Sequence, residues 1–262
     1  MLAAERRRAI LASLQSGGAV RVADLAAALS VSEMTVRRDL DALDAQELLS
    51  KVHGGAVTRH HRGDEPRSAE KAQQRRAEKV AIARAAAALV DDGMTIAIGA
   101  GSTTTELARL LRVRPSVTVI TNSLPVFDVL TAPDAESPGP AAYLSGGTRT
   151  PSDALVGPIA DTALASFRVD ATFLGVHGVD EHAGLTSPNV AEAQTNRTLI
   201  EVSARLVVLA DHTKYGEVGA CVFARLDQVH ALIVDDGLNA DARSVLDERV
   251  GELTVVTPGE HS

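Results

Sequence analysis

The amino-acid sequence predicts an α/β protein in two parts: a small helical module with a β-hairpin, then a larger domain on a mainly parallel, Rossmann-like sheet. Beyond Gly93, short β-rich runs alternate with helical runs, which is typical of a parallel sheet covered on both faces. The first 57 residues lack this alternation and indicate three short helices and a hairpin. Charge divides similarly: residues 1–62 carry nine Lys and Arg against seven Asp and Glu, and the other 200 carry 17 against 27.

The first module is predicted from its apolar spacing and its helix ends. A helix over residues 3–15 stops at Gly17-Gly18. The second helix has apolar residues at the i, i+3, i+4 and i+7 positions of one buried face: Val22, Leu25, Ala26 and Leu29. Ser32 is a good N-cap for a third helix over residues 33–46, and residues 48–57 indicate a hairpin that turns at Gly54-Gly55.

The third helix has the residues of a helix that reads DNA. Its buried stripe leaves Thr35, Arg37 and Arg38 facing outward. Two helices joined by a tight turn form a helix-turn-helix, whose second helix enters the major groove, where guanidinium groups bind guanine or phosphate. Lys51 and His53 on the hairpin lie where a wing would touch the DNA backbone. The alternative is a solvated arginine pair on an ordinary three-helix bundle.

Residues 58–78 are predicted to form a linker between the two parts. They are charged and poor in large apolar side chains, and they merge into a helix that continues to Asp91-Asp92. A solvated face explains this charge run. The predicted domains are therefore a winged helix-turn-helix over residues 1–57 and an effector domain over residues 79–262.

The effector domain should place its ligand at one edge of the sheet. Seven strands are predicted, at residues 95–98, 117–121, 141–144, 171–174, 206–210, 232–235 and 253–256, and helices between them include 104–111, 153–167 and 191–204. Ligands of parallel sheets bind outside the carboxyl ends of the strands. Small residues, hydroxyls, an Asp and a Lys follow most of these strands.

The loop after the first of these strands suits an anion. Gly101 lets the backbone approach closely, the amides of the following helix point outward, and Ser102, Thr103 and Thr104 add hydroxyl donors. The loop is neither a Walker A motif nor a dinucleotide fingerprint. A Gly-rich turn before a Thr-capped helix is the alternative.

Other strand ends add to this chemistry. Lys214 supplies a counter-charge, and Asn122 and Asp180 could bind hydroxyls, so a small phosphorylated polyol or sugar fits the edge.

The sequence resembles the DeoR family of bacterial transcription regulators. In the first module, the resemblance rests on Ser-Glu-Met-Thr-Val-Arg-Arg-Asp-Leu at 32–40 and Lys-Val-His-Gly-Gly-Ala at 51–56. In the effector domain, it rests on the loop with Gly101 to Thr104 and on four further segments: Thr121-Asn122-Ser123, Gly146-Gly147, Gly178-Val179-Asp180 and Asp211 to Gly216. It implies a winged helix-turn-helix, and from about residue 75 to 236 an effector domain related in fold to ribose-5-phosphate isomerase and glucosamine-phosphate deaminase. It also implies that these loops, including Thr121, Gly146 and Gly147, bind a phosphorylated sugar.

Composition excludes several other classes. Cys221 is the single cysteine, so an intramolecular disulfide and a multi-cysteine metal site are both excluded. No apolar run approaches the roughly 20 residues of a membrane helix, and six aromatics argue against base stacking. We expect a cytoplasmic protein without metal, cofactor or membrane partner.

The sequence therefore predicts a repressor of a carbohydrate-metabolism operon, controlled by a sugar phosphate and without enzymatic activity. Helix-turn-helix proteins read paired half-sites, so a dimer or tetramer binding double-stranded operator DNA is expected. One alternative is a sugar-phosphate isomerase or deaminase with a DNA-binding head, for which Asp180 and Glu192 are the candidate bases. Another is a binding module without DNA function, which leaves the first 57 residues unexplained.

Overall fold

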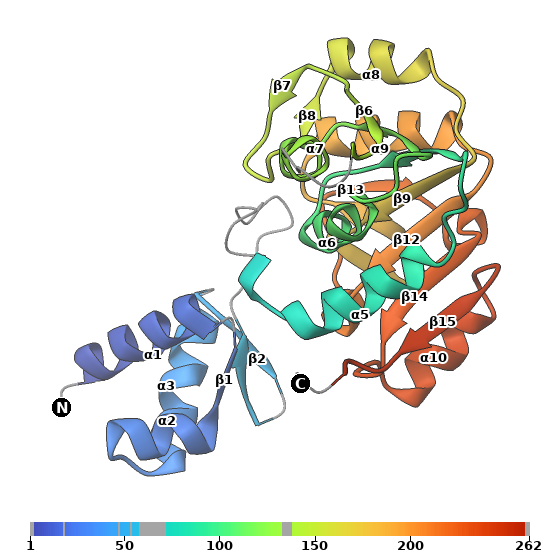
Figure 1. The fold of residues 1–262 in the computed structure, drawn as a ribbon. Coiled ribbons are helices and arrows are strands. Elements are labelled where there is room, and N and C mark those ends of the chain that lie inside the picture. Colours follow the sequence, from blue (N-terminus) through green and yellow to red (C-terminus); the bar gives the residue numbers. More distant parts are fainter. Residues whose placement is uncertain are drawn as a thin grey trace. The chain divides into compact units, whose positions relative to one another are not determined.

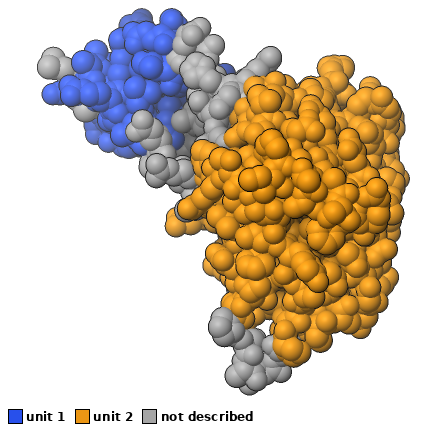
Figure 2. Space-filling model, turned by 90° about the horizontal axis from the view of Figure 1, so that it is seen from above, with its two compact units in different colours: residues 1–61 blue, residues 62–262 orange. Residues whose placement is uncertain are grey.

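A computed structural model describes residues 3–17, 19–46, 48–52, 54–57, 72–132 and 138–259. Its contacts divide the chain into two units, residues 1–61 and 62–262 (Figure 2). His53 and most of the predicted linker, residues 58–71, lie outside the described residues.

The first unit packs three helices against a small antiparallel sheet. In chain order its elements are α1 (Ala3–Gly17), β1 (Ala19–Arg21), α2 (Val22–Leu29), α3 (Glu33–Ala45), β2 (Ser50–Val52) and β3 (Gly55–Val57) (Figure 1). The strand order is β1-β3-β2. Apolar side chains from all three helices form its core, among them Ile10, Leu14, Leu25, Val36 and Leu40. The three predicted helices and the hairpin are confirmed.

The turn between α2 and α3 is fixed by its caps. Ser30 ends α2 in the left-handed conformation, with φ 53°, and its N–H bonds carbonyls of the last turn. Ser32 caps α3, because its hydroxyl accepts a hydrogen bond from the Thr35 amide at 3.2 Å. The three residues between α2 and α3 thus redirect the chain into α3.

The second unit is built on a seven-stranded parallel sheet. The order is β15-β14-β12-β9-β4-β5-β6, and every neighbouring pair is parallel. The strands are β4 (Thr95–Ile98), β5 (Thr118–Thr121), β6 (Ala141–Leu144), β9 (Ala171–Gly175), β12 (Leu206–Ala210), β14 (Ala231–Asp235) and β15 (Leu253–Val256). These are the seven strands that the sequence predicts.

Helices cover both faces of this sheet (Figure 1). One core cluster joins Ile96 and Ile98 to α5 (Arg76–Ala87), α6 (Ser102–Leu111) and α7 (Leu124–Thr131). The other joins Ala97 to α8 (Pro158–Ala165), α9 (Val190–Glu201) and α10 (Ala240–Asp247). Alternate residues of one strand thus enter opposite cores, as the pleat requires.

The region between β6 and α9 corrects one sequence expectation. The predicted helix over residues 153–167 exists only as α8, which begins at Pro158. Residues before it form β7 (Thr148–Arg149) and β8 (Leu155–Val156), an antiparallel pair. Gly157, at φ 89°, cannot continue a right-handed helix, and proline favours the first helical position that follows.

A second, antiparallel sheet adjoins the main one. It contains β10 (Gly178–Asp180), β11 (Gly184–Ser187) and β13 (Cys221–Ala224), in that order. Short 3-10 turns at 212–214 and 226–228 complete the unit. Within the described ranges, no helix combines the length and the apolarity that a membrane crossing needs.

Candidate functional sites

The outward face of α3 carries the residues predicted to read DNA. The side chain of Arg37 is 56% exposed and forms an i,i+4 ion pair with Glu33 at 3.1 Å, and Arg38 is exposed too. The Ser32 and Thr35 hydroxyls lie 2.9 Å apart at the start of the helix. Exposed side chains and a weak surface pair leave both guanidinium groups able to reorient toward a phosphate or a base edge.

The hairpin places one further predicted residue beside the same helix. Lys51 on β2 pairs with Asp41 of α3, and both side chains are exposed. The wing residue is therefore adjacent to α3. Contact of these residues with DNA stays a prediction, and His53 lies outside the described part of the chain.

A buried carboxylate that sequence reasoning missed locks α1 against α3. Asp39 is 2% exposed and accepts hydrogen bonds from Arg6 and, at 3.1 Å, from Arg7. Burial alone would raise the pKa of Asp39, but the hydrogen bonds and charges of these two arginines outweigh it and lower the pKa. The carboxylate faces inward, and thereby orients the helix whose other face carries Arg37 and Arg38.

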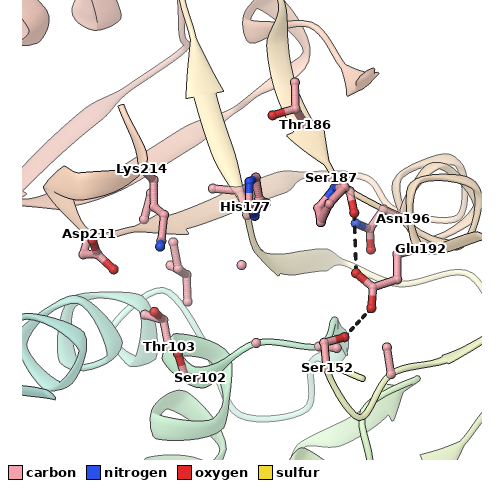
Figure 3. Close-up of a pocket in the computed structure, with 18 of the residues that line it drawn as sticks. Ser102, Thr103, Ser152, His177, Thr186, Ser187, Glu192, Asn196, Asp211 and Lys214 are labelled. Carbon is pink, nitrogen blue, oxygen red and sulfur yellow. Dashed lines mark hydrogen bonds between the residues drawn. The ribbon is translucent and has the colours of Figure 1, made fainter. Parts of the chain in front are cut away.

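A polar pocket opens in the second unit at the carboxyl ends of four parallel strands (Figure 3). Gly101 to Thr103 follow β4, Asn122 follows β5, Val176-His177 follow β9, and Asp211, Thr213 and Lys214 follow β12. Other elements complete the wall with Thr186 and Ser187 of β11, Glu192 and Asn196 of α9, Ser152, and Gln74, Arg75 and Lys79 at the start of α5.

Five of the ten predicted effector residues line this pocket: Gly101, Ser102, Thr103, Asn122 and Lys214. They reach it because their strands are parallel neighbours, so that their carboxyl ends meet at one edge. The α6 helix begins at Ser102, and its first amides have no partner within the helix. This part of the wall is therefore rich in donors for an anion.

The other five predicted residues, Thr104, Thr121, Gly146, Gly147 and Asp180, are absent from the pocket wall. The Thr104 hydroxyl donates to the carbonyls of Gly99 and Gly101, and the buried Thr121 hydroxyl donates to the carbonyl of Ile98. Both hydroxyls thus bond backbone carbonyls.

The remaining three shape turns. Gly146 and Gly147 have φ of 72° and 118°, which favour glycine. The Asp180 carboxylate accepts hydrogen bonds from the His182 and Ala183 amides in the turn after β10; the Ala183 bond contributes most to lowering the pKa of Asp180. A direct role of these residues in binding stays a prediction.

Two lysines flank a buried aspartate at one end of the pocket. Asp211 is 3% exposed and accepts from the backbone and hydroxyl of Thr213. Burial acts to raise its pKa, but the charge of Lys214, the Thr213 hydrogen bonds and the charge of Lys79 together lower it. The carboxylate stays ionised beside two ammonium groups, so this end is cationic in sum.

A neighbouring pair of hydrogen bonds fixes the loop that carries Lys214. Nδ1 of His212 lies 2.6 Å from Oδ2 of Asp235, which is 1% exposed, and the His212 amide donates to the other oxygen at 2.7 Å. The loop after β12 is therefore anchored to the end of β14, which holds the lysine at the pocket.

Glu192 lies on the side of the pocket away from Lys214 and Asp211 (Figure 3). The Glu192 carboxylate accepts from Thr150 at 2.7 Å, from Ser152, and from Ser187 at 3.5 Å. Asn122 is 1% exposed; its Nδ2 donates to the Leu155 carbonyl at 3.1 Å, and its Oδ1 has no hydrogen-bond partner among the described residues.

The residues at the start of α5 were missed because they precede the first strand of the sheet. Lys79 is 4% exposed, lines the pocket, and donates to the Gln74 carbonyl at 2.6 Å. Arg75 lines it too, in a left-handed conformation with φ 54°. No local signal in the sequence marks them, since only packing of α5 on β12 and β14 brings this end to the site.

The described residues offer little to a metal. No group of three or more His, Cys, Asp or Glu is arranged among them to hold an ion. Of the two carboxylates considered as catalytic bases, Glu192 lines the pocket and Asp180 is absent from its wall.

A helix-turn-helix unit with an exposed arginine pair, joined in sequence to an α/β unit with a polar strand-end pocket, defines a ligand-responsive DNA-binding regulator. Family models agree: residues 6–62 match the DeoR-like helix-turn-helix domain and residues 74–236 the DeoR C terminal sensor domain. The chain belongs to the DeoR family of transcription regulators.

Relatives of known name span nearly the whole chain. The HTH-type transcriptional regulator GlpR of Haloferax volcanii is 34% identical over 248 residues, 94% of this chain and 95% of that protein. The transcriptional repressor AccR of Agrobacterium fabrum is 32% identical, covering 89% and 90%. The lactose phosphotransferase system repressor of Staphylococcus aureus is 34% identical, covering 88% and 91%.

Among solved structures, ribose 5-phosphate isomerase A of Methanocaldococcus jannaschii resembles part of the chain. It is 24% identical, with a TM-score of 0.38, over 52% of this chain and 53% of that one. The match concerns half of each chain and says nothing about activity.

Proposed function

We propose that this regulator represses a carbohydrate-metabolism operon and that a phosphorylated sugar, bound in the strand-end pocket, controls its affinity for the operator. The observation that carries the effector part is the pair of ammonium groups, Lys79 and Lys214, at a pocket that the start of α6 also lines. The names of relatives, including a lactose phosphotransferase system repressor, agree with a sugar-linked role.

The cationic end of the pocket suits a phosphate. Two ammonium groups and the first amides of α6 supply donors that fit phosphate oxygens. The negative charge of Asp211 partly neutralises the positive charges of the two lysines. This end of the pocket therefore attracts one anionic group without being strongly basic. Ser102 and Thr103 add hydroxyl donors beside it.

Ligand binding can change the conformation of the segment that leads toward the DNA-binding unit, residues 72–75. Lys79 joins the pocket to the Gln74 carbonyl, and Gln74 and Arg75 line the pocket themselves. In sequence these residues directly follow 58–71, which connect to the helix-turn-helix. A phosphate that draws the Lys79 ammonium competes with that carbonyl, and so favours another arrangement of residues 72–75; coupling equals the ligand's differential affinity for the two arrangements.

On the DNA side, Arg37 and Arg38 bind bases or phosphates, Ser32, Thr35 and Lys51 support them, and His53 extends the contact. A homo-oligomer, dimer or tetramer, supplies two such helices for the two half-sites of an operator.

The pocket binds its ligand without converting it. Glu192 accepts hydrogen bonds from three hydroxyls, an arrangement suited to a fixed acceptor. The isomerase or deaminase alternative predicts turnover of ribose 5-phosphate or glucosamine 6-phosphate by the purified protein; such turnover would replace the present proposal for this pocket.

The experiment is an electrophoretic mobility shift on the DNA upstream of the protein's own gene, at several salt concentrations, with and without sugar phosphates. Replacing Arg37 and Arg38 by Ala should lower affinity at least tenfold and reduce the salt slope by about one per lost phosphate contact. The matched control replaces two exposed arginines of the second unit, Arg168 and Arg225, and should bind as the wild type does. Unchanged binding by the α3 variant would refute the assignment.

A further inference from the structure

The amide of Asn122 is buried with an unused acceptor. Its side-chain Nδ2 donates to the Leu155 carbonyl at 3.1 Å, and its backbone carbonyl accepts from the Leu155 amide at 2.6 Å. The Nδ2 bond fixes the orientation of the side-chain amide, because a flipped amide would set Oδ1 against the Leu155 carbonyl oxygen. Oδ1 is therefore left without a partner among the described residues, in a side chain that lines the pocket.

An unsatisfied buried acceptor is unfavourable, so such an atom in a pocket wall is suited to a ligand that brings a hydrogen-bond donor. The Oδ1 atom can be satisfied by a hydroxyl or an amino group, but it repels a phosphate oxygen. The pocket wall at Asn122 therefore prefers a hydroxyl or amino group to a phosphate group.

Glu192 carries the same preference with a full negative charge. It lines the pocket from α9 and is held by Thr150, Ser152 and Ser187. The segment 150–155 thus supports both acceptors, since its first part bonds Glu192 and its last residue bonds Asn122. In Figure 3, Glu192, Ser152 and Asn196 lie on the side away from Lys214 and Asp211.

We infer that the pocket distinguishes the two ends of its ligand: the lysine end takes one phosphate, and Asn122 Oδ1 with the Glu192 carboxylate accept hydrogen bonds from hydroxyl or amino groups at the far end. The ligand class is a sugar monophosphate with a donor group remote from its phosphate. A second phosphate at that end would meet Glu192 and is rejected. This inference rests on the proposed function.

The test is isothermal titration calorimetry of the full-length protein. The probes are ribose 5-phosphate, fructose 1-phosphate, tagatose 6-phosphate and glucosamine 6-phosphate, then fructose 1,6-bisphosphate, tagatose 1,6-bisphosphate and inorganic phosphate. The best monophosphate should bind at least about tenfold more tightly than either bisphosphate, since a charged hydrogen bond or its loss is worth that much.

Two variants assign the discrimination to the named residues. Glu192→Gln, which keeps size and hydrogen bonding, should strengthen bisphosphate binding about tenfold relative to the monophosphate. Asn122→Leu should weaken binding of the best monophosphate about tenfold and leave binding of inorganic phosphate unchanged. A deoxy analogue of that monophosphate, which lacks the hydroxyl donor, should bind the Asn122→Leu variant as tightly as the monophosphate itself does. Glu201→Gln, exposed on the same helix as Glu192, is the matched control and should behave as the wild type.

The outcomes separate the two proposals. If monophosphates bind but bisphosphates bind equally well, and Glu192→Gln changes neither, this inference is overturned and the proposed function stands. If Asn122→Leu weakens inorganic phosphate as much as the monophosphate, Asn122 acts on pocket structure and its part as a specificity residue is overturned. If no sugar phosphate binds the wild-type protein, both proposals fall.

Discussion

Replacing Asp39 by Asn should destabilise the helix-turn-helix unit without changing the exposed face of α3 that carries Arg37 and Arg38. Asp39 bridges α1 and α3 as a buried carboxylate held by Arg6 and Arg7. Asparagine keeps the shape and one acceptor oxygen, but its amide places a donor against an arginine donor. The charge that compensates the two guanidinium groups disappears as well.

The magnitude follows from the burial of each partner. The Arg6 side chain is 13% exposed, so its charged hydrogen bond is worth about 1.5–3 kcal/mol. The Arg7 side chain is 36% exposed, and a pair so open to solvent contributes about 0.2–1 kcal/mol. Because Asn retains one acceptor and Arg7 can turn to solvent, we expect a total loss of about 2 kcal/mol, below the 3–5 kcal/mol of a fully enclosed broken pair.

The assay is hydrogen exchange of the full-length protein, followed by mass spectrometry of peptides from α1 and α3. A loss of about 2 kcal/mol should speed exchange of their protected amides roughly thirtyfold. Asp41→Asn is the control: it lies on the same helix and pairs with Lys51, but its side chain is 58% exposed, so the change should stay below about 1 kcal/mol. Equal effects of the two substitutions would refute the argument from burial.

Three further predictions concern the second unit. Lys214→Met should weaken binding of the best sugar monophosphate by roughly 10–100-fold in calorimetry, whereas a loss below threefold would remove Lys214 from the phosphate end. Because its folded-state pKa is lowered, Asp211 contributes stability that is complete above about pH 4 and lost as pH falls through that lowered pKa; acid unfolding of Asp211→Asn should show a shallower dependence on pH in this range. Phe173→Ala, at 0% exposure in the sheet core, should cost about 3–5 kcal/mol in thermal or denaturant unfolding.

The main sheet could be predicted because buried parallel strands leave a strong trace in the sequence. All five residues of β12 and of β14 are buried; β12 is a continuous apolar run, and β14 is apolar up to Asp235. The antiparallel sheet has no such trace. Its strands have three or four residues, β10 contains Gly178 and Asp180, and β11 pairs with β13 across more than 30 residues of chain. Such pairing depends on tertiary packing.

The candidate site divides in the same way. Gly101, Asn122 and Lys214 reach the pocket wall because a topological rule places all strand ends at one edge. Thr104 and Thr121 are also predicted, but their hydroxyls bond nearby carbonyls, and their part in binding stays a prediction. Hydroxyl side chains often satisfy local backbone groups, and only coordinates show which do so.

Asp39 and Lys79 show what the sequence could not supply. Each is a charged residue that is almost fully buried, and a charged side chain is normally expected on the surface. Arg6 and Arg7, the partners of Asp39, lie 33 and 32 residues away in the chain, and Asp211, near Lys79, lies still further. Burial of a charge is tolerable only once such partners are in place, so it follows from the fold and not from the neighbouring sequence.

Both proposed anion sites of this chain use cations, but they hold them differently, and the difference suits their tasks. Arg37 is exposed and pairs with Glu33 on its own helix, so salt screens it and DNA can draw it away at little cost. Lys79 is buried against the Gln74 carbonyl and near Asp211, so its charge is screened much less and its removal must disturb those partners. A duplex whose charge is spread over many phosphates is served by mobile arginines. A single small ligand must change the conformation of the protein. It is better bound by a lysine whose movement also changes the arrangement of the neighbouring chain.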